Sequence, residues 1–259
     1  MQAVYKNIVS DIIPQFKAVS LKEIDKISFL NRVDTKFVFN IHKLPDILKE
    51  SLEYYKILEI KKNRIFSYKT YYFDSDDYKL YLSHQNGKLN RYKVRIREYL
   101  TTKDYFVELK QKTNKNRTVK TRLKIDKQVD YLPDNAMDFL NKQLPIDVAA
   151  LKNKLTVLFD RITLADFINN ERVTVDFNLK YEKNNNTIEL PYLTIVEIKN
   201  DRNSSFSELY RILKKHNIHP LGMSKYCIGL LQFEKELKYN NFKKRLITLK
   251  KIKNETSVA

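Results

Sequence analysis

Residues 90–99, with the sequence NRYKVRIREY, place a basic side chain at every second position. The basic residues are Arg91, Lys93, Arg95 and Arg97, and tyrosine, valine and isoleucine stand between them. Successive side chains of a β-strand point to opposite faces of its sheet. The pattern therefore predicts a half-buried strand that carries all of these positive charges on one face, and few folds can accommodate such a strand.

The same alternation recurs in five other segments of the chain. They are NRVDTKFVF (31–39), DYFVELKQK (104–112), TVKTRLKI (118–125), ERVTVDF (171–177) and TIVEIKN (194–200). A solvated sheet face normally mixes neutral polar residues with charges of both signs, because like charges on paired strands destabilise the pair by up to about 1 kcal/mol. A mostly basic face repeated on neighbouring strands therefore predicts an anion bound among them. If the sheet closes into a barrel, these side chains would line its interior.

The spacing of apolar residues predicts an α+β fold in which strands dominate. Strands are expected at 32–40, 66–73, 78–83, 91–99, 104–112, 118–126, 171–181 and 193–199. Helices are expected at 20–27, 43–55, 135–144 and 204–216, and the first and last begin with capping-box patterns at Ser20 and Ser205. Together these elements predict an antiparallel, roughly eight-stranded β-barrel that forms a basic tunnel, with flanking helices.

The composition predicts a packed fold with a polyanionic partner. The chain has 259 residues, a formal net charge of +18 and 42% hydrophobic residues. No Gly/Ser-rich or Pro-rich linker divides it, so we expect one tunnel domain at 1–235 followed by a basic tail at 236–259. Such a tail is either solvated or in contact with a membrane or nucleic acid.

Other features of the sequence exclude several classes of protein. It has no run of about 18 apolar residues and no signal-peptide pattern, which predicts a cytoplasmic protein without a transmembrane segment. The single cysteine, Cys227, excludes an internal disulfide, and one cysteine with four scattered histidines does not make a zinc site. The three glycines are not clustered as in a P-loop, so any phosphate groups must be bound by side chains.

A lining of arginine and lysine suits a run of phosphate groups. Arginine offers a planar fork of donors to phosphate oxygens, and lysine offers a compact point charge. The acidic residues on the same face are Asp34, Glu108, Asp176 and Glu197. Each could bind a divalent cation that bridges to phosphate oxygens, or could instead pair with a nearby lysine. Glu197 is the strongest candidate for a metal ligand, because the VEIK sequence puts it beside Lys199 on one face.

The order of these motifs resembles that of the VTC domain, the catalytic domain of the vacuolar transporter chaperone polyphosphate polymerases and of stand-alone bacterial relatives. The resemblance covers about residues 25–230, through RVDTKF, YYFDS, YKVRIREY, FVELKQK, TVKTRL, DRITL, RVTVDF, VEIKN and MSKYCIG. It implies membership of the triphosphate tunnel metalloenzymes, in which a basic tunnel holds a nucleoside triphosphate and a divalent metal, usually Mn²⁺ or Mg²⁺. The polymerases among them transfer the γ-phosphoryl group to a growing inorganic polyphosphate chain.

The family's motifs imply roles for particular residues of this chain. Those implied to be catalytic are Lys36, Arg95, Arg97, Lys110, Arg161 and Lys225. The same residues are expected to bind phosphate, together with Lys120, Arg122, Arg172 and Lys199. Glu197 matches the metal-binding glutamate. Arg32 and Asp34 replace the first two acids of the E-x-E-x-K strand common in the superfamily, which favours the polymerase-like branch.

The sequence thus predicts metal-dependent phosphoryl transfer from ATP to inorganic polyphosphate, and it leaves three alternatives open. They are an inorganic or nucleoside triphosphatase, a protein that binds polyphosphate without turnover, and a nucleic-acid-binding protein. The last is disfavoured, because Tyr92, Tyr99 and Tyr105 fall on the face opposite the cations or at strand ends. No nucleic-acid partner is therefore expected, and the oligomeric state is not predicted. A tunnel open at both ends would suit a growing chain, whereas a plugged one would suit hydrolysis.

Overall fold

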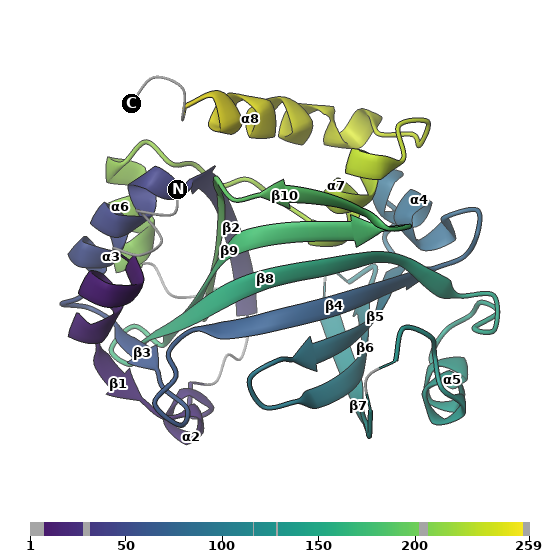
Figure 1. Cartoon of the computed structure of the whole chain (residues 1–259), viewed down its shortest axis with the longest axis horizontal. Coiled ribbons are helices and arrows are strands. Elements are labelled where there is room, and N and C mark those ends of the chain that lie inside the picture. Colours follow the sequence, from purple (N-terminus) through teal and green to yellow (C-terminus); the bar gives the residue numbers. More distant parts are fainter. Residues whose placement is uncertain (1–7, 28–31, 116, 128, 202–206, 256–259) are drawn as a thin grey trace.

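The computed structural model describes residues 8–27, 32–115, 117–127, 129–201 and 207–255. One mostly antiparallel sheet forms the centre of the molecule (Figure 1). Its main path runs through β2 (Arg32–Asn40), β11 (Leu193–Asp201), β9 (Glu171–Lys183), β8 (Lys152–Asp166), β4 (Phe66–Asp74), β5 (Arg91–Tyr99), β6 (Asp104–Lys112) and β7 (Thr118–Ile125). Three short strands lie beside this path: β1 (Lys17–Val19), β3 (Lys56–Leu58) and β10 (Asn186–Leu190).

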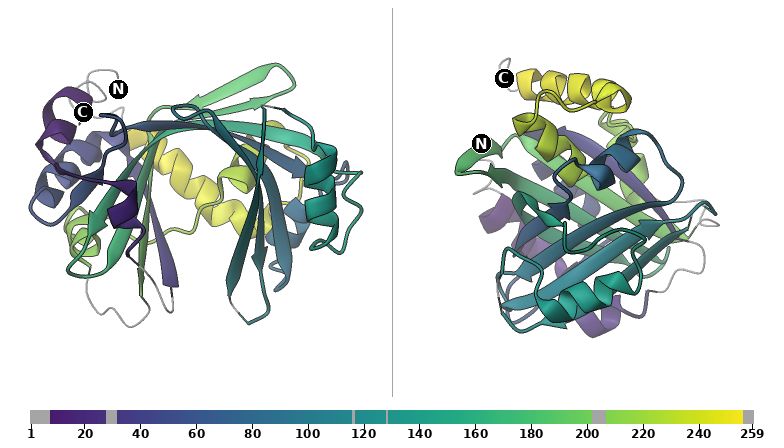
Figure 2. Two further views of the ribbon diagram at one scale, coloured as in Figure 1. Left: turned by 90° about the horizontal axis from the view of Figure 1, so that it is seen from below. Right: turned by 90° about the vertical axis from the view of Figure 1, so that its right-hand side faces the viewer.

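The sheet curls into an arch. Figure 2 shows β2 and β11 in one wall of the arch and β6 and β7 in the opposite wall. Among the described residues no hydrogen-bonded pair joins β2 to β7, so the barrel is a half-barrel that stays open between these two strands. The predicted α+β tunnel fold with flanking helices is confirmed. The inner side of the arch is called the concave face below.

Most predicted strands are confirmed to within two residues at each end. The strand predicted at 78–83 is wrong, because these residues belong to α4 (Lys79–Gln85). The buried carboxylate of Asp74 accepts hydrogen bonds from the backbone N–H groups of Leu80 and Tyr81, each at 2.8 Å. A side chain outside the segment thus satisfies the free N–H groups of a helix start, and this overrides the local alternation.

The longest strand, β8, was not predicted. Much of its length is buried on both faces, so its apolar residues form runs such as TVLF and ITLA instead of alternating. A register shift between Leu158 and Asp160, in the pairing with β9, also breaks the period of two. β8 lies at the centre of the main path, where it pairs with both β4 and β9.

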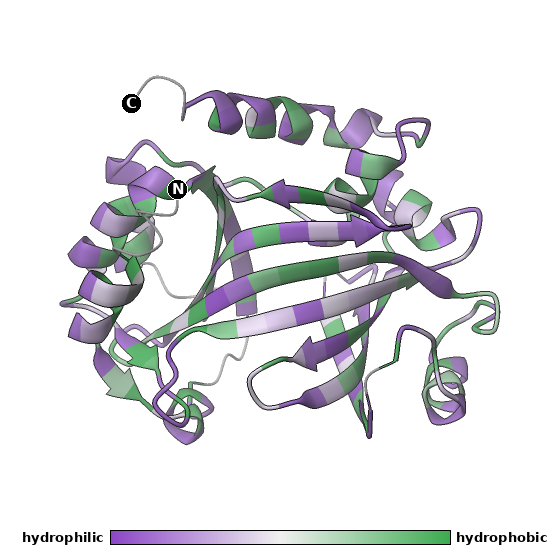
Figure 3. Cartoon of the chain, viewed as in Figure 1, coloured by the Kyte–Doolittle hydropathy of each residue, from purple (hydrophilic) through white to green (hydrophobic). Residues whose placement is uncertain are grey.

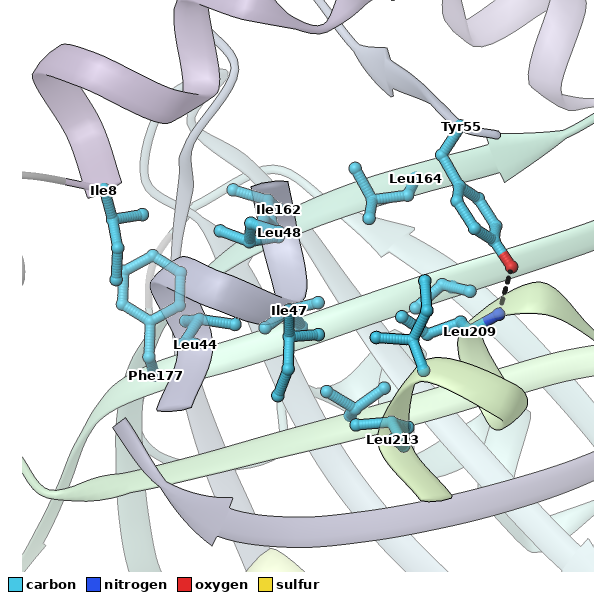
Figure 4. Close-up of a cluster of buried hydrophobic side chains, with 14 of the residues drawn as sticks. Ile8, Leu44, Ile47, Leu48, Tyr55, Ile162, Leu164, Phe177, Leu209 and Leu213 are labelled. Carbon is cyan, nitrogen blue, oxygen red and sulfur yellow. Dashed lines mark hydrogen bonds between the residues drawn. The ribbon is translucent and has the colours of Figure 1, made fainter. Parts of the chain in front are cut away.

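Helices cover the outer face of the arch on two sides. On one side, η1 (Ile8–Ile12), α3 (Leu44–Ser51) and α6 (Glu208–Lys215) pack against apolar side chains of β2, β8, β9 and β11 (Figure 4). On the other side, α5 (Asp134–Asn141) packs against apolar side chains of β4, β5 and β6. Because these apolar side chains point outward, the basic side chains that alternate with them point into the concave face.

Two helix starts were predicted from capping-box patterns. The first is confirmed: Ser20 and Glu23 exchange hydrogen bonds at the start of α2 (Leu21–Ile24). The N-cap of α6 is Ser207, whose Oγ accepts a hydrogen bond from the backbone N–H of Tyr210 at 3.1 Å. Ser205, the predicted cap, lies outside the described residues.

Two helices near the C-terminal end close part of the arch. α7 (Lys225–Phe233) packs against the concave face, where Tyr226 stacks on Tyr72 with ring centroids 5.1 Å apart. α8 (Lys243–Asn254), in the segment predicted as a tail, buries Leu249 and Ile252 in the same cluster and exposes its lysines. Figure 3 shows hydrophilic and hydrophobic residues alternating along this helix.

Single-turn helices η2 (Ile13–Gln15), η3 (Ile41–Lys43) and η4 (Asn240–Phe242) complete the described chain. Across these described stretches, every helix is too short or too polar to cross a membrane.

Gly229, in the middle of α7, provides a test of this packing. A Cβ at this position would overlap the ring of Tyr181 and lie 2.8 Å from Leu155 Cδ2. We expect Gly229→Ala to lower the free energy of unfolding by about 1–3 kcal/mol, measured by urea denaturation. The control is Gly222→Ala, whose Cβ would have its nearest neighbour, Arg245 Nη2, at 3.8 Å and should change stability by less than about 0.5 kcal/mol. Equal stability of the two variants would contradict the close packing of α7.

Candidate functional site

The concave face brings together the basic side chains that the alternation predicted. On β5, β6 and β7 the register aligns these side chains in cross-strand rows. The rows are Lys93–Lys110–Lys120, Arg95–Glu108–Arg122 and Arg97–Phe106–Lys124. Cross-strand neighbours on one face have Cβ atoms only about 5 Å apart, so the charges within these rows interact directly.

The other wall contributes a second group of charges from β2, β11, β9 and β8. Its cross-strand pairs are Lys36–Glu197, Asp34–Lys199, Lys199–Arg172 and Arg161–Asp176.

The two walls are close enough to influence each other. The protein atoms around Lys110 exclude water from it and are the largest cause that lowers its pKa to about 8. The positive charges of Lys36 and Lys93 are the next causes. The Lys110 side chain is nevertheless exposed to the solvent within the arch. The basic groups of both walls therefore converge inside the arch and do not point away from it.

Glu108 binds two cations from neighbouring strands. Its side chain is only 1% exposed, and its Oε2 accepts a hydrogen bond from Arg95 Nε at 2.6 Å. Its Oε1 accepts one from Lys120 Nζ. Burial alone would raise the pKa of Glu108, but Arg95, Arg97 and Lys120 outweigh burial and hold the pKa well below its usual value. Glu108 is therefore a charged carboxylate that holds two basic side chains in place.

Asp176, on β9, likewise binds two cations, one from β8 and one from α7. It forms a two-pronged ion pair with Arg161, at 2.5 Å from Nε and 2.7 Å from Nη2, and also accepts a hydrogen bond from Lys225 Nζ. The side chain of Asp176 is 4% exposed, and the attraction of these two cations outweighs burial and holds its pKa well below the usual value.

Glu197 repeats the arrangement on β11. Lys199 Nζ lies 2.9 Å from Glu197 Oε2, and Lys36 Nζ binds Oε1. Burial would raise the pKa of Glu197, but Lys199 and Lys36 keep it well below the usual value. We call the three groups the carboxylate clamps: Glu108 with Arg95 and Lys120, Asp176 with Arg161 and Lys225, and Glu197 with Lys36 and Lys199.

Some basic residues between the clamps are not neutralised by a carboxylate. Within the described part of the chain, neither Arg97 nor Lys110 forms an ion pair. Arg97 is 6% exposed, and its Nε has no hydrogen-bond partner there. Burial and the nearby Arg95 lower the pKa of Arg97 from its usual value. A buried cation without a partner is costly, so this part of the concave face is suited to an anion.

Two further residues of the concave face, Lys93 and Ser224, are not among those to which the family's motifs give a role. Lys93 Nζ donates a hydrogen bond to Ser224 Oγ at 2.9 Å. Ser224 is the N-cap of α7, and its Oγ also accepts a hydrogen bond from Cys227 N at 3.3 Å. The N-terminus of α7 therefore points into the basic face, where its dipole adds to the positive potential. Lys93 could have been found from its place in the alternation, whereas Ser224 had no such signal.

The aromatic rings of Phe159 and Tyr68 lie beneath the cations, and this arrangement was also not predicted. Phe159 of β8 lies under three of them, with its ring centroid 4.5 Å from Lys225 Nζ, 5.3 Å from Arg161 Cζ and 5.7 Å from Arg97 Cζ. Tyr68 stacks on Phe159 at 5.2 Å. Rings beneath cations attract them through their negative faces and limit the directions in which they can point.

Two of the expected phosphate ligands lie at the edge of this site. Arg172 Nη2 donates a hydrogen bond to the carbonyl oxygen of Ile24 in α2 at 2.7 Å, so one of its donor groups is already in use. Arg122 is exposed, with its guanidinium carbon 4.9 Å from the centre of the Phe106 ring. The other basic residues predicted for the site lie on the concave face, and so does Glu197.

The residues fit a divalent metal that arrives with phosphate groups. No cluster of three or more His, Cys, Asp or Glu side chains is found in the described residues, so the described chain offers no protein cage for a metal. Mg²⁺ and Mn²⁺ in nucleotide sites are bound by one or two carboxylates together with phosphate oxygens. Glu197, which is partly exposed on the concave face, is the carboxylate that would hold such a metal.

The curled sheet with a basic concave face is the architecture of a tunnel protein. The sequence model of the VTC domain matches residues 31–234. The chain therefore belongs to the VTC domain family, as its motifs predicted. No curated protein matches the chain.

Several solved structures are similar in fold. A candidate adenylate cyclase from Bacillus halodurans has 18% identity and a TM-score of 0.49, over 75% of this chain and 94% of its own. A candidate adenylyl cyclase from Hippeastrum, described as having a dominant triphosphatase activity, has 13% identity and a TM-score of 0.46, over 81% of this chain and 100% of its own. With both scores below 0.5, the family assignment depends on the VTC domain match.

The Glu108 clamp can be tested through stability. Glu108→Gln should lower the free energy of unfolding by about 2–4 kcal/mol, because Arg95 and Lys120 would then repel each other without a carboxylate between them. Thermal denaturation measures this, and inorganic triphosphate should raise the melting temperature of the variant by more than that of the wild type.

Asp104→Asn is the matched control, because it breaks the exposed ion pair of Asp104 with Lys124 on the same strands. This change should cost no more than about 1 kcal/mol. If the two variants lose the same stability, Glu108 does not act as a clamp.

Proposed function

We propose that this protein transfers the γ-phosphoryl group of a nucleoside triphosphate to inorganic polyphosphate on its concave face. The observation that most supports this is the pair of uncompensated cations, Arg97 and Lys110, placed among basic side chains that the carboxylate clamps hold in position. Membership of the VTC domain family also supports a ligand with linked phosphates.

The concave face would bind phosphate oxygens by fixed charges. Arg95, Arg97 and Arg161 supply planar groups of hydrogen-bond donors. Lys110 on β6 and Lys225 on α7 supply point charges. The carboxylate clamps keep these groups ordered before the ligand binds, so little conformational entropy remains to be lost on binding.

Phosphoryl transfer suits such a site. The transition state is loose, with charge spread over the equatorial oxygens of the transferred group, so preorganised cations lower its free energy. An oxygen of the terminal phosphate of polyphosphate forms the new P–O bond, and the bond to the β,γ-bridging oxygen breaks. The nucleoside diphosphate then leaves with that oxygen. The attacking phosphate is already ionised at neutral pH, so no protein base is needed.

Glu197 would hold the divalent metal against the phosphates. The metal would neutralise charge on the phosphate oxygens when bound. Lys36 and Lys199, which now bind Glu197, would be released to contact phosphate oxygens themselves. Glu197 would therefore bring two basic side chains and a metal together on the paired strands β2 and β11.

Hydrolysis of a triphosphate is the second candidate, and one observation favours it. α7 packs on apolar side chains of the concave face, including Leu155, Val157 and Tyr72, and so fills part of that face. A partly filled tunnel suits attack by water on a short substrate more than passage of a long chain.

The two candidates are separated by their products. The purified protein is incubated with ATP and Mn²⁺, polyphosphate is resolved on a gel, and free phosphate is measured. Long chains with little free phosphate support the transferase, and free phosphate without chains supports the hydrolase. If neither product forms, the proposed activity is wrong.

Glu197→Ala should reduce turnover roughly a hundred-fold or more while leaving most of the affinity for phosphate, because the freed Lys36 and Lys199 remain cationic. Steady-state rates and calorimetric titration with inorganic triphosphate measure the two effects separately. The control is Glu189→Ala, an exposed glutamate on β10 that lies outside the site. An unchanged rate in Glu197→Ala would remove the metal assignment.

Lys110 should make phosphate binding depend on pH. Its pKa of about 8 in the free protein means that its positive charge is present at pH 7 and is lost as the pH rises through 8. The dissociation constant for inorganic triphosphate should therefore increase between pH 7 and pH 9. In Lys110→Arg this contribution should disappear, because a guanidinium stays protonated throughout that range. Identical pH profiles for the two proteins would contradict a role for Lys110.

A further inference from the structure

Three aromatic rings lie together at the end of the concave face next to the β5–β6 hairpin. They are Tyr68 on β4, Tyr99 at the end of β5 and Phe106 near the start of β6, and we call them the aromatic rim. The ring centroids of Tyr68 and Tyr99 are 5.1 Å apart, and those of Tyr99 and Phe106 are 5.8 Å apart. Both pairs meet edge to face, so the rings form one continuous apolar surface.

Core packing does not explain Tyr99 and Phe106. Neither ring belongs to a hydrophobic cluster of the described residues, and both are partly exposed. The residues on either side of Phe106, Tyr105 and Val107, point the opposite way and pack into the outer cluster with α5. Phe106 thus places an apolar ring on the part of the concave face formed by β5, β6 and β7, which is otherwise mostly charged.

The aromatic rim is in direct contact with the phosphate-binding cations. Phe106 is the cross-strand neighbour of Arg97, whose guanidinium carbon lies 5.3 Å from the centre of the Tyr68 ring. Arg122 lies over Phe106 at 4.9 Å. The next row of the face, with Arg95 and Glu108, lies two residues further along the strands, or about 7 Å away. A ribose separates a base from its phosphates by a comparable distance.

We propose that the aromatic rim stacks the base of a nucleoside triphosphate, with Phe106 and Arg122 as its main contacts, while Arg97 and the cations beyond it bind the phosphates. This inference deepens the proposed function and depends on it. Stacking on a ring or a guanidinium needs no particular hydrogen-bonding edge, so the site accepts every base and prefers the larger purines. A nucleotide should therefore bind more tightly than inorganic triphosphate on this face.

The ratio of two dissociation constants tests this. Titration calorimetry with ATP and with inorganic triphosphate, both with Mg²⁺, measures binding whether or not turnover occurs. Phe106→Leu should weaken ATP roughly ten-fold or more and change inorganic triphosphate less than about two-fold. Tyr105→Leu, which removes the neighbouring ring from the outer face, is the matched control and should leave the ratio of the two constants unchanged.

A second variant keeps the inference testable if Phe106→Leu does not fold. The chain contains no tryptophan, so Phe106→Trp places a single indole at the rim. ATP and GTP should quench its fluorescence, and inorganic triphosphate at the same site occupancy should not. In Tyr105→Trp neither ligand should change the emission.

The outcomes separate this inference from the proposed function. If both ligands bind and Phe106→Leu weakens them equally or not at all, the base does not stack on the rim and the inference is wrong, while phosphate binding stands. If neither ligand binds the wild-type protein, the inference and the proposed function both fail. Loss of ATP affinity alone supports the inference.

Discussion

The concave face depends on the pairing of buried carboxylates with cations. Glu108, Asp176 and Glu197 each bind two basic side chains that would otherwise repel one another. Within a half-barrel this repulsion acts at short range in partly dehydrated surroundings, where it is far stronger than on an open surface. The carboxylate clamps therefore allow one face of the sheet to carry many cations and still fold.

The same arrangement explains why the site is both stable and ready to bind. The outer face of the arch is held by apolar clusters under α3, α6 and α5, and α7 adds a further apolar cluster on part of the concave face, so the charged side chains are not needed for cohesion. Inside, the clamps neutralise part of the positive charge, whereas Arg97 and Lys110 have no ion-pair partner among the described residues. An anion that binds between them gains the full attraction of charges whose ordering has already been achieved during folding.

The two ends of the concave face differ in chemistry. At one end, Ser224 at the N-terminus of α7 accepts a hydrogen bond from Lys93, and the apolar side of α7 fills part of the face. At the other end, the aromatic rim adjoins Arg97. A nucleotide bound with its base on the rim would direct its phosphates towards α7, and this polarity links the proposed base site to the proposed transfer of the terminal phosphoryl group.

The sequence by itself determined the strands that alternate and the side on which their cations lie, because a period of two is a local property of a strand. It also identified the VTC domain family. The helix at residues 79–85, the strand β8 and the partners of the buried carboxylates were decided only by tertiary structure. Asp74 turns residues 79–85 into a helix through contacts outside that segment, and β8 hides its period by being buried on both faces. The sequence could not decide whether Glu108 and Asp176 bind metal or cations. The structure pairs each with two basic groups. The sequence alone cannot show these pairs, because the partners are separated along the chain and become neighbours only when the strands pair and α7 packs against the sheet.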